Sequence, residues 1–127
     1  MASMVKLSSS GSFKNSQAFF KRMQSKSMYD ILDKYGREGV AALSAATPVD
    51  TGLTAASWGY EVEITDKVAK ISWWNSNTNK GTPIALIIQY GHATGNGGYV
   101  EGIDYINPAM KPIFEELEKK VWKEVTK

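Results

Sequence analysis

The stretch WGYEVEITDKVAKISWW, residues 58–74, decides the fold class of this chain. Its apolar residues alternate with glycine or charged residues in the first half, and this period of two is typical of a strand with one buried side. Asp66-Lys67 is the predicted tip of a hairpin. Pairing across that tip places the apolar residues on one face. The predicted opposite pairs are Thr65–Val68, Ile64–Ala69, Val62–Ile71 and Tyr60–Trp73.

Upstream of this hairpin, residues 27–46 predict a long helix. Its apolar positions recur mostly at steps of three and four, which is the pattern of a helix with one side on a core. They are Met28, Ile31, Leu32, Tyr35, Gly39, Val40, Leu43 and Ala46. Ser27 and Asp30 have the spacing of a capping box at the start. Pro48 predicts the end, because the residue before a proline avoids the helical conformation.

Gly36 and Gly39 interrupt the predicted helix, and each costs up to about 1 kcal/mol relative to alanine in a helix interior. Two explanations remain open at this point: another backbone packs closely against that turn, or the helix bends there. In front of the helix, residues 1–14 predict a flexible N-terminal arm or an edge strand. Asn15 then caps a short predicted helix, with an apolar side formed by Ala18, Phe19, Phe20 and Met23.

The second half of the chain predicts shorter elements. Residues 75–81 form a polar loop, and Thr82-Pro83 reads as a cap followed by a first-turn proline. The apolar run 84–90, closed by Gly91, then predicts a short helix, although a buried strand fits the same run. Five glycines make residues 91–102 a predicted flexible loop that leads into a short strand near residues 99–105.

A C-terminal helix is predicted from one apolar stripe and from its charge order, with glutamates early and lysines late. The stripe consists of Ile113, Phe114, Leu117, Val121 and Val125. Pro108 and Pro112 do not both fit in one regular helix, because an interior proline loses a hydrogen bond and clashes with the preceding turn. The helix therefore starts near Pro112 or kinks there.

These elements predict an α+β fold, in which a small antiparallel β-sheet packs against a long helix in the N-terminal half and a C-terminal helix. A single domain is expected over residues 15–127, behind the arm of residues 1–14. The chain has no cysteine, which excludes disulfides and zinc-thiolate sites. Its longest strongly apolar run, residues 84–88, is far below the ~20 residues of a membrane span. We therefore expect a soluble intracellular protein with no membrane partner.

The charge distribution raises one functional alternative. The net charge is only +2, but residues 1–40 carry seven basic and three acidic side chains, a local balance of +4. This excess could form an electrostatic footprint for DNA. Solvated helix faces are the more common explanation of such an excess. A DNA-binding module therefore stays open as an alternative function of another class.

Catalytic motifs have simpler interpretations. Asp50-Thr51-Gly52 matches the triplet of aspartic proteases, which need two carboxylates across a dimer axis. Here the triplet follows a helix through Pro48, and a turn explains all three residues. His92 is the only histidine, and no nucleophile-elbow pattern surrounds Ser57 or Ser72. We predict no catalytic residue.

No ligand site is predicted either. His92, Glu101 and Asp104 fit no metal-ligand spacing, and the glycine-rich loop lacks the lysine of a phosphate loop. No metal or cofactor is therefore expected. Trp73 and Trp74 are adjacent, so in a strand they face opposite ways. One belongs to the core, and the other is either a partner contact or covered by the chain's own helices. The candidate interface residues are Trp73, Trp74, Asn77, Asn79, Asn96 and Tyr99.

Several motifs, in this order, resemble one protein family. ATPVDTG at residues 46–52, followed by ASW at 56–58, resembles the central signature of the head–tail joining and tail-completion proteins of long-tailed bacteriophages. QYGH at 89–92 and GGYVEG at 97–102 resemble the family's tyrosine–glycine–histidine segment and its glycine-rich approach to the last helix. NPAM at 107–110 with Pro112 resembles the start of that helix. The resemblance covers roughly residues 12 to 125, and Gln89 stands where the family more often has an acidic residue.

The resemblance implies a structural virion protein of the tail or neck, present in the host cytoplasm during assembly, with no catalytic residues. Copies would form a homo-oligomeric ring, expected to be a hexamer, through whose lumen DNA passes. Its partners would be head connector or neck proteins and a tail tube or tail terminator protein. A tail terminator or other tail protein is the related alternative. The implied fold-defining residues are Pro48, Asp50, Thr51, Gly52, Trp58, Tyr90, Gly91, His92 and Gly102.

Overall fold

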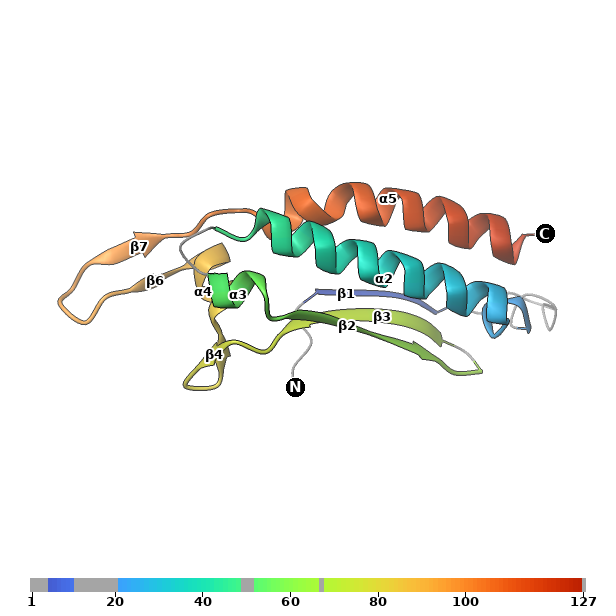
Figure 1. Cartoon of the computed structure of the whole chain (residues 1–127), viewed down its shortest axis with the longest axis horizontal. Coiled ribbons are helices and arrows are strands. Elements are labelled where there is room, and N and C mark those ends of the chain that lie inside the picture. Colours follow the sequence, from blue (N-terminus) through green and yellow to red (C-terminus); the bar gives the residue numbers. More distant parts are fainter. Residues whose placement is uncertain (1–4, 11–20, 49–51, 67, 127) are drawn as a thin grey trace.

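The computed structural model describes residues 5–10, 21–48, 52–66 and 68–126. A three-stranded antiparallel sheet has the order β1–β3–β2. Two long helices, α2 (Lys26–Ala46) and α5 (Ile106–Val125), lie on the same side of it (Figure 1). Helix α2 packs on the sheet, and α5 runs antiparallel along α2 (Figure 1). The chain therefore has the predicted α+β fold.

The central hairpin consists of β2 (Trp58–Ile64) and β3 (Val68–Asn75). Its register confirms three predicted pairs, Ile64–Ala69, Val62–Ile71 and Tyr60–Trp73. At the tip, the Thr65 backbone N–H donates to the Val68 carbonyl at 2.7 Å. Strand β1 (Val5–Ser10) pairs with the other edge of β3, so this part of residues 1–14 adopts the edge-strand alternative. The predicted helix from Asn15 lies mostly outside the described residues.

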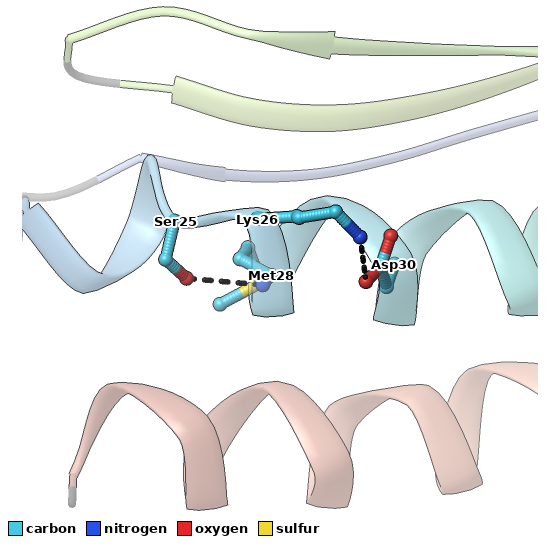
Figure 2. A network of polar contacts seen from close by, with 4 residues as sticks. All are labelled: Ser25, Lys26, Met28 and Asp30. Atoms are coloured by element: carbon cyan, nitrogen blue, oxygen red, sulfur yellow. Dashed lines mark hydrogen bonds and ion pairs between the residues drawn. The ribbon is translucent and has the colours of Figure 1, made fainter.

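Helix α2 begins at Lys26, and its N-cap lies two residues earlier than the predicted Ser27. Ser25, with an extended backbone, is the N-cap, and its Oγ accepts the Met28 N–H at 3.0 Å (Figure 2). The predicted capping box of Ser27 and Asp30 is therefore wrong. Asp30 instead pairs with Lys26 at 3.0 Å, one turn away on the exposed surface (Figure 2). The predicted end is confirmed, because the helix stops at Ala46.

Aromatic rings explain the two glycines of α2. A Cβ on Gly36 would lie 2.6 Å from Cε2 of Tyr60, and one on Gly39 would lie 2.7 Å from Cε2 of Trp73. The neighbours are therefore side chains of the sheet, not another backbone. The buried Trp73 Nε1 also donates to the Gly36 carbonyl at 2.9 Å. The Trp73 ring lies 5.9 Å from the ring of Phe114, which brings α5 into the same core.

A buried polar network joins the end of α2 to the sheet. Thr47 Oγ1 donates to the Leu43 carbonyl and accepts the Trp58 indole N–H at 2.9 Å. Beyond Pro48, residues 49–51 lie outside the described residues, and Gly52 begins a short helix, α3 (Gly52–Ala55), that was not predicted. Asn75 Nδ2 donates to the Thr54 carbonyl at 2.8 Å, which fixes α3 to the end of β3.

Residues 75–83 differ from the prediction. The expected loop contains a small two-stranded pair, β4 (Thr78–Asn79) and β5 (Thr82–Pro83). Lys80 and Gly81 turn between them with positive φ angles of 51° and 83°. Thr82 therefore belongs to a strand and does not cap the next helix. That helix, α4 (Ile84–Tyr90), is confirmed, and it ends as predicted at Gly91, whose φ is 81°.

Helix α5 begins at Ile106, so the alternative of a start near Pro112 is wrong. Pro108 falls in the first turn, where the N–H has no helical partner in any case, while Pro112 lies inside the helix. The N-terminus of α5 is capped by Gln89, which is buried in α4. Its Oε1 accepts the N–H groups of Tyr105 and Ile106 at 3.0 and 2.9 Å, and its Nε2 donates to Asp104 at 2.7 Å.

Replacing Gly39 with alanine should destabilise the fold. The added methyl would displace the Trp73 ring from its buried site, and overpacking of this kind costs about 1–3 kcal/mol. Gly52→Ala is the matched control, because a Cβ there meets nothing within 4 Å. Urea unfolding should show a lower midpoint for Gly39→Ala and an unchanged or higher midpoint for Gly52→Ala. Equal midpoints for Gly39→Ala and the unchanged protein would contradict this packing.

Gln89→Glu should destabilise the chain more at neutral than at acidic pH. The new carboxylate would face Asp104 at the present 2.7 Å contact, and like charges this close cannot both ionise. One carboxyl pKa is then raised on folding, so stability falls as pH rises through the unfolded value. We expect a loss of about 2 kcal/mol at pH 7.5 and a smaller one at pH 4. The double variant Gln89→Glu/Asp104→Asn places an amide donor beside the new carboxylate. Urea unfolding of this variant should recover most of the lost stability.

Burial raises the pKa of Tyr105 from 10.0 to about 12. Between these values the unfolded chain loses this proton and the folded chain keeps it, so stability falls as pH rises through that window. Tyr105→Phe removes this contribution, along with the 2.8 Å hydrogen bond to the Ala85 carbonyl. Stability measured by urea unfolding should therefore fall less steeply between pH 10 and 12 in the variant. If stability declined equally steeply in both proteins, the raised pKa of Tyr105 would be refuted as the cause.

Candidate interaction surface

A second hairpin projects away from the body of the molecule. Strand β6 (Gly91–Ala93) continues directly from α4 and pairs with β7 (Tyr99–Glu101), and the pair extends beyond the helices and the sheet (Figure 1). The prediction of a flexible loop over residues 91–102 is therefore wrong for residues 91–93 and 99–101, which form strands. The following strand is also shorter than predicted, because residues 102–105 lie outside it.

Two glycines form the base of this hairpin. A Cβ on Gly91 would lie 2.7 Å from the Gly102 nitrogen, and one on Gly102 would lie 2.7 Å from the carbonyl carbon of Tyr90. The two backbones therefore touch at a distance that side chains would prevent. The Ile103 N–H donates to the Ile88 carbonyl at 2.9 Å and continues the pairing toward α4. Gly91 and Gly102 both belong to the segments that carry the family resemblance.

Large apolar side chains are exposed on the hairpin and at its base. Their exposed fractions are Tyr90 68%, Tyr99 63%, Ile103 55% and Val100 47%. Large apolar residues gathered on one projecting element are typical of a protein–protein contact. We call these four residues the hairpin surface. The Tyr99 hydroxyl donates to the Tyr90 carbonyl at 2.9 Å, which holds one ring of this surface against the base.

Two parts of the chain that are far apart in the sequence meet beside the hairpin surface. A shallow hollow of about 200 Å³ is lined by Pro48 from the end of α2, Ile88 from α4 and His92 from β6, together with Val100 and Ile103. Pro48 and His92 come from two different motifs of the resemblance and are 44 positions apart in the chain. The hollow is mostly apolar in its lining side chains, so it suits an apolar side chain of a partner.

The two tryptophans have different positions. Trp73 is fully buried in the core and so contributes no surface to a partner. Trp74 is half-buried on the opposite face of the sheet, where its ring covers Gly59. This confirms that the two side chains face opposite ways. Only Trp74 stays available as a contact residue.

The other predicted interface residues differ in exposure and in their contacts. Asn77 is half-buried and donates to Thr54 Oγ1 at 2.9 Å, so it has a structural role. Asn79 is exposed on β4. Asn96 is exposed at the end of the projecting hairpin and accepts the Thr94 hydroxyl at 2.6 Å. Tyr99 is the predicted residue that lies within the hairpin surface.

Two of the described residues weighed for chemistry, Asp104 and His92, lie on either side of the second hairpin. Asp104 accepts hydrogen bonds from Gln89 and from Asn107, at 2.7 and 3.0 Å. His92 is exposed and pairs with Val100 across the hairpin. Within the described part of the chain, no group of three His, Asp or Glu side chains is placed to hold a metal ion. Asp50 and Thr51 lie outside the described residues.

Sequence reasoning missed most of the hairpin surface. Tyr90 and Ile103 were predicted in a short helix and in a strand, and no role was predicted for Leu53, which is also strongly exposed. Their signal was present, because large apolar residues are flanked by glycine at Gly52, Gly91 and Gly102. Gln89 was noted only as a departure from the family pattern. A buried amide within an apolar run is a signal for a polar partner elsewhere.

Among the described helices, none is both long and apolar enough to cross a membrane. Comparison with family models, with curated proteins and with solved structures gave no significant match to this chain.

Proposed function

We propose that this chain is a non-enzymatic structural subunit of a tailed bacteriophage that assembles into a ring at the junction of head and tail. The observation that carries the proposal is the projecting hairpin with its exposed apolar surface. Exposed apolar residues on an element that extends from the body serve binding rather than folding, because they bury little area within their own chain. The subunit then acts by contacts with neighbours.

The positions of the resemblance motifs support the same proposal. Pro48, His92 and Gly102 come from three separate motifs, and all lie at the base of the hairpin or in the hollow beside it. The motifs thus meet at the surface best suited for contact. Their residues include glycines and prolines, which shape the backbone in turns.

A ring requires two different patches on each subunit that bind one another, because identical patches give a closed dimer. The hairpin surface supplies one such patch. DNA would pass through the lumen, and head connector or neck proteins and the tail tube would bind the two ends. A tail terminator role would use the same contacts with other partners. Electron microscopy of intact particles distinguishes the two positions.

Replacing Val100 and Ile103 with serine together should weaken self-association without unfolding the chain. Both side chains are about half exposed, so folding loses little, whereas residues central to an interface contribute about 2 kcal/mol or more to binding. Size-exclusion chromatography with light scattering should show a shift from ring to monomer. Tyr29→Ser is the control, because Tyr29 is comparably exposed on α2 at the opposite end of the molecule. A wild-type protein that is strictly monomeric and absent from purified virions would overturn the proposal.

A further inference from the structure

A second hollow lies at the edge of the main sheet that no other described strand covers. The strand order places β2 at an edge, with β3 as its partner. An open hollow of about 380 Å³ lies at this edge, and residues of α2, β2 and β3 line it. They are Arg37, Val40, Trp58, Gly59, Tyr60 and Trp74. We call it the edge hollow. Its lining combines three aromatic rings with a single cationic side chain.

The edge hollow has the character of a receptor for an apolar strand. Trp74 lies over Gly59, where a Cβ would come within 2.8 Å of its ring. Arg37 lies at the rim with two-thirds of its side chain exposed, and its nearest acidic partner, Asp33, is 3.4 Å away. Aromatic residues and arginine are the types most enriched at binding hot spots. A free strand edge also offers backbone groups to an added strand.

The β7 strand has the complementary chemistry. Tyr99 and Val100 are exposed and apolar, and the next residue, Glu101, is exposed and acidic. Tyr99 and Glu101 lie on one face of β7 and Val100 on the other, so an aromatic ring and a carboxylate can together face a hollow that has aromatic walls and a guanidinium. Arginine and carboxylate groups form the stronger, charge-assisted class of hydrogen bond.

The arrangement of the two elements excludes a contact within one chain. The hairpin points away from the body, while the edge hollow lies along β2 on the body itself (Figure 1). We propose that β7 of one copy docks into the edge hollow of the next copy, with Glu101 facing Arg37. This rests on the proposed function, since it names the contact through which the ring would form. The two patches are different, so the contact is of the head-to-tail kind that closes into rings.

Cysteine cross-linking tests the pairing directly, because the chain has no cysteine of its own. Full-length Arg37→Cys and Val100→Cys are mixed and treated with a short bis-maleimide. We expect a covalent dimer in the mixture and little in either protein alone. Lys119→Cys, on the exposed side of α5, replaces Arg37→Cys in the control mixture and should give none. Urea unfolding confirms that each variant is folded.

The possible outcomes separate this inference from the proposed function. If the wild-type protein forms rings but Val100→Cys links mainly to itself, or not to Arg37→Cys, the docking inference is wrong and the ring proposal stands. If the wild-type protein stays monomeric at all concentrations and is absent from purified virions, both are overturned. If particles contain the subunit and Val100→Cys links only to another virion protein, the hairpin has a different partner and the docking inference also fails.

Charge reversal provides a second test. Arg37→Glu alone and Glu101→Arg alone should each weaken association by about tenfold, because like charges then meet at the contact. Arg37→Glu/Glu101→Arg restores opposite charges and should recover most of the affinity. Lys119→Glu serves as the control for a change in net charge. If the double variant lost as much affinity as the two single variants lose together, contact between these residues would be excluded.

Discussion

The fold depends on the contact of one indole ring with one turn of helix. Trp73 is fully buried, lies where a side chain on Gly39 would be, and donates its N–H to the Gly36 carbonyl. The same ring contacts Phe114 of α5, so a single side chain joins the sheet to both long helices. The glycines that weaken α2 as an isolated helix are what allow it to approach the sheet this closely.

Local pattern predicted the central hairpin and its register because the information is contained in neighbouring residues. A one-residue slip in the pairing of residues 58–64 with 68–75 would place Ile71 on the face opposite to Val62 and Ile64. The start of α2 was misplaced because Ser25 and Ser27 both offer a hydroxyl two residues apart. Sequence alone does not reveal which backbone is extended there. The length of α5 was also ambiguous, since its cap comes from Gln89, 17 positions from Ile106 in the chain.

The candidate surface was harder to predict. Tyr99 was identified, but Tyr90, Val100 and Ile103 join it only because Gly91 and Gly102 allow two backbones to touch. Trp73 was a candidate for contact and proved to be the centre of the core, as its predicted pairing with Tyr60 on the apolar face already indicated. The edge hollow depends on residues from three elements, and no local pattern connects Arg37 to Trp74.

The Gln89 side chain gives the projecting hairpin a mechanical link to the rest of the molecule. It stands two residues before β6, and it holds the first N–H groups of α5 together with Asp104, which follows β7. Both legs of the hairpin are thus anchored to the start of the helix that packs along α2. The base of the hairpin therefore cannot shift relative to the start of α5 without breaking these hydrogen bonds.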